Sequence, residues 1–293
     1  MPPRVLKWIE MPRPRVERKH PTPLVLVNGL AEQQQSWFAN ERQLSRRFDL
    51  KQPEVLVYDG DALHRRIDAG LEITVDYLAE RLGAYLHEVV QRPPYHLVAS
   101  SLGCQVVATY AAANPERVGR LVLICPSGFH GDENLPMVEG VRRSNYDALV
   151  GSVFHENRRA EGRLVAAFEK KFQDRRWKKG VLRTLRGTVG HSVAPLLPRI
   201  AAPTLVIWGT EDQILSDVPG SIRAAARIPD VRQVVIPRCG HAPQIEKARL
   251  VNRLITGHLT GKLGRLPRSF DPSRFLDRPR AGEPVARLAH LPS

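Results

Sequence analysis

Two adjacent serines, Ser100 and Ser101, follow a short apolar run in the stretch LVASSLGCQVV (97–107). A nucleophilic serine on a sharp turn between a strand and a helix needs very small residues two positions before and two positions after it, because larger side chains collide in such a turn. Ser100 has bulky residues at those positions, whereas Ser101 has Ala99 and Gly103. The spacing therefore predicts Ser101 as the nucleophile and Ser100 as a small polar neighbour.

A serine hydroxyl is a weak nucleophile until a base removes its proton, and that base needs an acid to hold its tautomer. Of the ten histidines, His241 stands out, because it lies in RCGHAPQIE, a Gly-containing loop between an apolar run and the last helical pattern. The acid is expected in PTLVIWGTEDQIL (203–215), where Glu211 and Asp212 follow another apolar run. Spacing along the sequence leaves both carboxylates open as the partner of His241.

The elements that must position these residues are apolar, β-rich runs with helical patterns between them. Strands are predicted over residues 23–29, 54–60, 95–100, 120–126, 203–209 and 232–237, and helices over 73–89, 102–113 and 249–259. Near-continuous Val, Leu and Ile runs are typical of strands covered on both faces by helices. The pattern predicts an α/β fold with a doubly wound, mostly parallel sheet.

The regular alternation of strands and helices breaks between residues 127 and 200, where helical stripes occur without a convincing strand. We interpret 127–200 as a helical cap or lid inserted into a core formed by 21–126 and 201–260. Residues 1–20 form a basic N-terminal segment. Residues 261–293 are rich in Pro and Arg and lack periodicity, so we expect a tail with little order.

The net charge of +14 is concentrated at the two termini and in the insertion. The stretch KKFQDRRWKKGVLRTLR (170–186) has eight Lys or Arg residues around apolar positions. Such a helix either associates weakly with an anionic membrane surface or presents the solvated outer face of a packed helix. The basic residues are not interleaved with aromatic ones, so no specific nucleic acid partner is expected.

The chain contains no apolar stretch long enough to span a bilayer, and its N-terminus lacks the features of a secretory signal. The three cysteines are widely spaced and form no CxxC pair, which argues against a disulfide framework or a zinc site. These features predict a cytoplasmic protein.

The motifs together resemble those of the α/β-hydrolase superfamily. The stretch VASSLGCQVVATYAAANPERVGRLVLICPSG (98–128) is similar to that family's nucleophile turn, following helix and next strand. WGTED followed by CGHAPQIEKA resembles its acid and histidine loops, in the same order along the chain. The resemblance implies that Asp212, rather than Glu211, is the acid. It further implies a serine hydrolase with the triad Ser101, Asp212 and His241, which cleaves a carboxylic ester or related acyl bond without a metal or organic cofactor.

The same resemblance implies an oxyanion hole made of two backbone N–H groups, those of Leu102 and Leu30. Leu30 lies in the loop VNGLA (27–31), in which Asn28 stands where the family usually has a histidine that orders the loop. The expected partner is a small, apolar acyl substrate. Carbon–carbon bond hydrolases and acyltransferases keep the same triad, so they stay open, as does a non-catalytic ligand-binding protein of the same fold.

Overall fold

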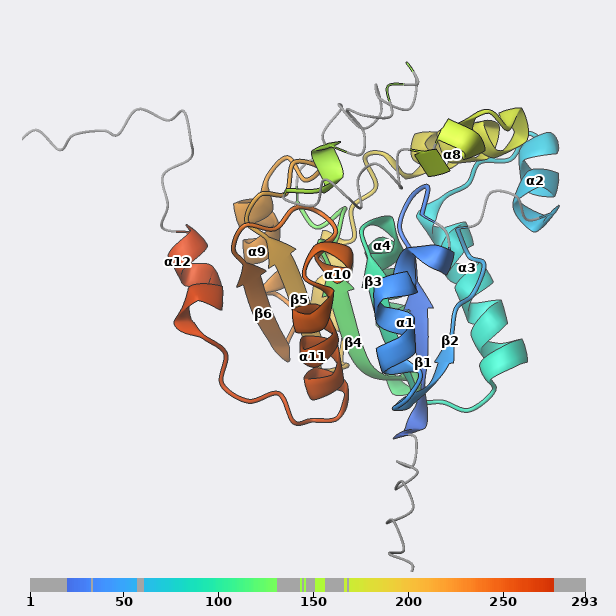
Figure 1. Cartoon of the computed structure of the whole chain (residues 1–293). Helices are drawn as coiled ribbons and strands as arrows, with labels where there is room; N and C mark the ends of the chain where they lie inside the picture. The colour runs from blue at the N-terminus through green and yellow to red at the C-terminus, as the bar shows by residue number, and fades with distance from the viewer. Residues whose placement is uncertain are drawn as a thin grey trace, which may run out of the picture.

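The six strands of the described chain form one sheet in the order β2-β1-β3-β4-β5-β6, and all neighbours pair in parallel (Figure 1). The computed structural model describes residues 20–32, 34–56, 61–130, 143, 145, 151–155, 166–167 and 169–276. The strands are β1 (His20–Val27), β2 (Phe48–Lys51), β3 (Tyr95–Ser100), β4 (Val118–Ile124), β5 (Thr204–Gly209) and β6 (Val231–Ile236). The predicted parallel sheet is therefore confirmed.

Helices cover both faces of this sheet, as the predicted doubly wound architecture requires. The helices of one face are α1 (Phe38–Leu44), α10 (Pro243–Glu246) and α11 (Ala248–Leu259), and those of the other are α3 (Val75–Tyr85), α4 (Leu102–Ala113) and α9 (Val218–Ala225) (Figure 1). Alternate residues of β1 divide between the two apolar clusters, with Leu24 and Leu26 on the first face and Val25 and Val27 on the second. The near-continuous apolar runs follow from burial on both sides.

The register brings the carboxyl ends of the strands to one edge of the sheet. Val27 pairs with Ala99, and Ile124 pairs with both Ser100 and Ile207. In an open parallel sheet, the crevice at this edge is where ligands bind. The loops that follow β1, β3, β5 and β6 therefore share the place where a site is expected.

The described sheet contains a strand, β2, that the sequence does not predict, while the strand predicted over 54–60 is described only in part. Residues 54–56 form no strand, and 57–60 lie outside the described residues. In the described sheet β2 is an edge strand that pairs with β1, so only one of its faces must be apolar. Its Phe48 is accordingly buried and its Asp49 exposed. The more apolar Val55 and Leu56 are buried in the core without joining the sheet.

The three predicted helices are confirmed. α4 begins and ends where the sequence predicts, and α11 begins one residue earlier. The pattern over 73–89 corresponds to α3, followed by the π-helical turn η2 (Leu86–Val90). α3 begins where the Thr74 side chain accepts the backbone N–H of Tyr77 at 3.2 Å, a typical N-cap.

The described part of the insertion between β4 and β5 is helical. It includes α8 (Arg175–Thr188) and the 3-10 helix η4 (Ala194–Arg199). Asp174 caps α8, since its carboxylate accepts the backbone N–H of Arg176 at 2.8 Å. α8 lies beyond the carboxyl ends of the strands, beside α2 (Asp61–Asp68), and the Lys179 ammonium pairs with the Asp68 carboxylate at 3.1 Å (Figure 1).

The segment after α11 is more ordered than the sequence predicts. It contains the 3-10 helix η5 (Arg268–Phe270) and α12 (Pro272–Leu276), both of which contact β6. The Arg232 guanidinium of β6 donates to the main-chain oxygens of Leu263 and Gly264 at 2.7 and 2.9 Å. The apolar side chains that pack on the core here are Leu263, Leu266, Phe270, Phe275 and Leu276. Residues 1–19 and 277–293 of the predicted terminal segments lie outside the described residues.

Among the described helices, none is both long and apolar enough to cross a membrane. The three cysteines, Cys104, Cys125 and Cys239, are buried free thiols. Cys125 lies beside the functional residues described next.

Candidate active site

Ser101 occupies the turn between β3 and α4, with backbone angles (φ 50°, ψ −124°) that residues other than glycine seldom adopt. This is the strained turn that its small flanking residues predict. A Cβ on Gly103 would lie 2.5 Å from the main-chain oxygen of Asn28 and 2.9 Å from that of Val27. Because backbone atoms are in the way, only glycine lets α4 start this close to the end of β1.

Ser101, His241 and Asp212, which come from three different loops, form one chain of hydrogen bonds. The Ser101 Oγ lies 2.9 Å from Nε2 of His241, and the Nδ1 of His241 lies 2.8 Å from Oδ2 of Asp212. A carboxylate can only accept, so Nδ1 carries the ring proton and Nε2 accepts from the serine hydroxyl. The arrangement allows a proton to leave the hydroxyl while the resulting imidazolium stays paired.

The structure distinguishes the two carboxylates that sequence spacing left open. Glu211 is exposed, whereas the side chain of Asp212 is only 1% exposed. The second oxygen of Asp212 accepts the backbone N–H groups of Ile214 and Leu215 at 2.9 and 3.1 Å. Burial raises the pKa of Asp212, but the charge of His241 and these hydrogen bonds outweigh burial and lower it below its usual value. Asp212 is thus held as an anion against the histidine.

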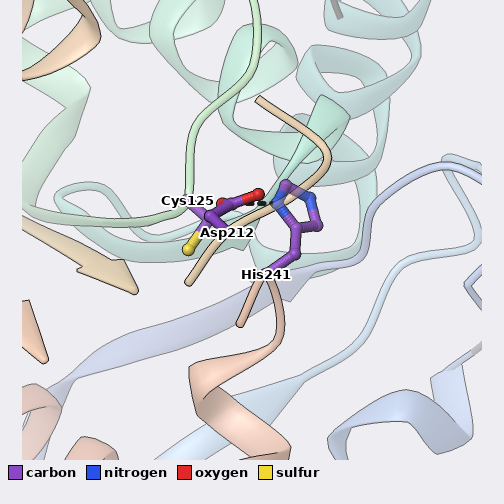
Figure 2. Close-up of side chains that lie close together, drawn as sticks. All are labelled: Cys125, Asp212 and His241. Atoms are coloured by element: carbon purple, nitrogen blue, oxygen red, sulfur yellow. Dashed lines mark hydrogen bonds and ion pairs between the residues drawn. The ribbon is translucent and has the colours of Figure 1, made fainter. Parts of the chain in front are cut away.

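Cys125 is the third side chain beside this pair, as Figure 2 shows. Possible metal-ligand atoms of Cys125, Asp212 and His241 lie within 4.8 Å of one another. A thiol binds metals as the thiolate. Burial, together with the charge of Asp212, raises the pKa of Cys125 well above its usual value. A metal would also have to displace the Asp212–His241 hydrogen bond, so the arrangement favours proton transfer over metal binding.

The two predicted oxyanion donors, Leu102 and Leu30, belong to two segments that meet at Ser101. Leu102 is the first residue of α4, and the N–H of a first helical residue has no partner within its helix. Leu30 is half-buried in the turn after β1. The neighbouring Gly29 packs against Ser101, since a Cβ on it would lie 2.9 Å from Cβ of Ser101. This turn therefore lies directly over the serine.

Two parts of the insertion contact these loops. The main-chain oxygen of Val153 accepts the backbone N–H of His241 at 2.8 Å. On the other side, Trp177 and Phe172 form an apolar cluster with Ala31, next to the predicted donor Leu30. The insertion thus packs on the histidine loop and on the turn after β1.

Sequence reasoning missed Glu32, whose side chain lies beside the nucleophile turn. Ser100, which the sequence predicts only as a small polar neighbour, donates its hydroxyl to the Glu32 carboxylate, with Oγ 2.9 and 3.1 Å from the two oxygens. The side-chain amide of Asn28 donates to the main-chain oxygen of Glu32 at 2.7 Å. The hydrogen bond between Ser100 and Glu32 has only a weak signal in the sequence. That signal is an acid at position 32, in a loop where Asn28 replaces the usual histidine of the family.

Known proteins resemble this chain over most of its length. A model of the alpha/beta hydrolase family matches residues 24–254. The chain is 22% identical over 260 residues to a monoacylglycerol lipase of Homo sapiens, covering 82% of this chain and 76% of the lipase. It is 29% identical over 178 residues to a 2-hydroxy-6-oxononadienedioate/2-hydroxy-6-oxononatrienedioate hydrolase of Paraburkholderia xenovorans, covering 56% of this chain and 61% of that enzyme. A solved serine hydrolase from Cycloclasticus zankles superposes with a TM-score of 0.71 at 18% identity, over 84% of this chain and 92% of that one.

Proposed function

Because the chain belongs to the α/β hydrolase family, we propose that it is a serine hydrolase that cleaves a carboxylic ester or a related acyl bond. The observation that carries this proposal is the unbroken relay from the Ser101 hydroxyl through His241 to Asp212, with contacts of 2.9 and 2.8 Å. These distances are within the reach that nucleophile, base and orienting acid need. The residue assignment rests on this geometry and on the sequence motifs.

In the proposed reaction, Ser101 Oγ attacks the substrate carbonyl carbon while His241 Nε2 takes the hydroxyl proton. The carbonyl oxygen becomes an anion, which the backbone N–H groups of Leu30 and Leu102 stabilise. The tetrahedral intermediate collapses, the bond to the alcohol breaks, and His241 returns the proton to the departing oxygen. A water molecule, deprotonated by His241, then attacks the acyl carbon, and His241 returns that proton to Oγ of Ser101 as the bond to the acid breaks. Asp212 stays ionised and holds the imidazolium throughout.

We assign residues 127–200 to a cap over this site and 21–126 together with 201–260 to the catalytic core. The contacts of Val153 with His241 and of Trp177 with Ala31 support a cap that reaches both sides of the nucleophile. Apolar side chains on the inner surface of such a cap suit an apolar acyl group.

The relatives favour two substrate classes. The similarity to a monoacylglycerol lipase supports an ester of an apolar acid. The similarity to the Paraburkholderia hydrolase supports a second candidate, hydrolysis of a carbon–carbon bond in a 2-hydroxy-6-oxo acid. We favour the ester, because an apolar cluster of Trp177, Phe172 and Val181 on the Ala31 turn suits an acyl chain better than a dicarboxylate.

A fluorophosphonate probe tests the nucleophile. We expect the wild type to label and Ser101→Ala not to label, while the matched control Ser221→Ala, at a buried serine of α9, labels normally. Labelling that persists in Ser101→Ala would reject the assignment, and a wild type that never labels would favour a non-catalytic ligand-binding protein. Aryl esters from acetate to palmitate, measured beside a 2-hydroxy-6-oxo-dienoate, then separate ester from carbon–carbon cleavage and report the acyl length.

An anionic membrane surface is the proposed macromolecular partner. The exposed basic residues of α8 are Arg175, Arg176, Lys179, Arg183 and Arg186. Such a face attracts anionic headgroups through a field that salt screens. We expect flotation with phosphatidylserine vesicles at low salt and loss of flotation at high salt. Equal recovery with neutral and anionic vesicles would contradict this partner.

A further inference from the structure

The half-buried side chain of Glu32 joins two parts of the site that the sequence keeps far apart. Accepting the acyl transfer proposed above, we propose that Glu32 is a positioning residue of that reaction. Its carboxyl group ties Ser100, beneath the nucleophile, to the turn that carries the Leu30 oxyanion donor. The link fixes the distance between Ser101 and that donor.

The contacts run in both directions from the carboxyl group. Toward the sheet, Ser100 is the last residue of β3, is 1% exposed, and donates its hydroxyl across both oxygens of Glu32. Toward the turn, a Cβ on Gly29 would lie 2.9 Å from Oε1 of Glu32 and equally 2.9 Å from Cβ of Ser101. Gly29 is therefore packed between the glutamate and the nucleophile, and its neighbour Leu30 carries the proposed donor.

The turn is closed at the same residue. The Asn28 side chain donates to the main-chain oxygen of Glu32 at 2.7 Å, and the N–H of Glu32 donates to the oxygen of Gly29 at 3.3 Å. These bonds shape residues 28–32 internally without attaching them to β3. The Glu32 carboxyl group supplies that attachment.

Packing alone gives no reason for an acid here. Burial raises the pKa of Glu32, and the groups that lower it in part are the Gly29 N–H, the Ser100 hydroxyl and the charge of His241, rather than a lysine or arginine. Removing part of such a carboxyl group from water without a cationic partner costs folding free energy. Stability therefore does not explain why an acid occupies position 32, whereas a role in holding the turn of residues 28–32 does.

The hydrogen bonds of Glu32 indicate a positioning role and not a direct role in proton transfer. The base and acid roles are taken by His241 and Asp212, whose hydrogen bonds to Ser101 and to each other are complete. Glu32 bonds to Ser100 rather than to the nucleophile. Its effect must therefore pass through the turn, and it should appear in the rate of acylation rather than in substrate affinity.

Four variants test the link: Glu32→Ala, Glu32→Gln, Ser100→Ala and the double variant Glu32→Ala/Ser100→Ala. The control is Glu41→Gln, an exposed acid of α1. We expect Glu32→Ala to lower kcat for an aryl ester by about 10- to 100-fold, the cost of misplacing a catalytic group by up to about 1 Å. KM should stay near the wild-type value, and fluorophosphonate labelling should slow by the same factor as kcat.

Glu32→Gln should recover most of the rate, because the amide oxygen still accepts the Ser100 hydroxyl. The double variant should be no slower than Glu32→Ala, because both changes break one link. Thermal unfolding confirms that each variant is folded, and if Glu32→Ala is not, Ser100→Ala and Glu32→Gln carry the test.

The proposal is overturned by wild-type kcat in Glu32→Ala or Ser100→Ala, by a Glu32→Gln variant as slow as Glu32→Ala, or by multiplicative losses in the double variant. Each of these outcomes leaves the serine hydrolase itself intact as long as the wild type labels. A wild type that neither labels nor turns over esters would instead reject the proposed function, and this inference with it.

Discussion

Replacing Gly103 by alanine should damage the site more than the fold. The added Cβ would lie 2.5 Å from the main-chain oxygen of Asn28, whereas ordinary contacts begin at 3.4 Å, so the backbone must move by about 0.9 Å. Overpacking of this kind costs about 1–3 kcal/mol, against about 1 kcal/mol gained from the helix preference of alanine over glycine. The net loss of stability is therefore about 1 kcal/mol.

The loss of activity should be larger, because the displaced atoms begin the turn that carries Gly29 and Leu30. A shift approaching 1 Å in a catalytic group costs about 100-fold in rate. We expect kcat for an aryl ester and the rate of fluorophosphonate labelling to fall together by about that factor. The melting temperature should fall only slightly.

Gly83→Ala is the matched control. Gly83 also lies in a helix, α3, but its added Cβ would meet Tyr110 Cε2 at an ordinary 3.4 Å. This variant should gain up to about 1 kcal/mol in stability and keep its activity. A Gly103→Ala variant with the stability and rate of Gly83→Ala would show that α4 does not approach β1 as described, and the reasoning for a small residue at this position would fail.

Three further predictions concern charged and titrating groups. Asp212→Asn should lower kcat by about 10⁴-fold, because the histidine loses the anion that fixes its tautomer, while Glu211→Gln keeps wild-type kinetics; equal losses would contradict the assignment. Burial lowers the pKa of His96 to about 3 and that of His258 to about 4. Both values lie below the ordinary 6.5, so protonation of either histidine opposes folding. The folded state is therefore most stable, with respect to these two groups, above pH 6.5 and loses stability as the pH falls. The unfolding free energy from urea titrations should thus fall below that pH by up to about 1.4 kcal/mol per pH unit for each histidine, and a flat profile would oppose this. Glu32→Gln should raise the melting temperature more near pH 8 than near pH 4, because the raised pKa of Glu32 makes its ionisation oppose folding; calorimetry at both pH values tests the difference.

The strained turn at Ser101 could be predicted because its constraint is local. Steric limits on a strand-to-helix turn act on residues two positions away, so Ala99 and Gly103 identify Ser101 without knowledge of the fold. The choice between Glu211 and Asp212 is different in kind. It depends on which side chain accepts the N–H groups of the next residues and turns inward, and only the resemblance to a family favoured Asp212 beforehand.

The described structure departs from the sequence predictions at both edges of the sheet, for a different reason at each. Apolar content predicts burial well, but an edge strand needs only one apolar face, so the sequence pattern favours the more apolar 54–60 and gives no signal for the short β2. At the other edge, β6 is covered by residues 263–276, whose attachment uses the Arg232 guanidinium and scattered apolar side chains. Such isolated contacts produce no periodic apolar pattern, so the sequence gives no sign that residues 263–276 are ordered.

Glu32 escaped prediction because its partner, Ser100, is 68 residues away and reaches it only through the pairing of β1 with β3. The same sheet pairing fixes Ser101 itself. The oxyanion turn and the histidine loop are instead in contact with the insertion, through Trp177 on one side and Val153 on the other. Ser101, the proposed nucleophile, is thus positioned by the core, whereas the proposed donor and base also depend on the insertion. Changes in the insertion should therefore alter the rate of the chemical step as well as the choice of substrate.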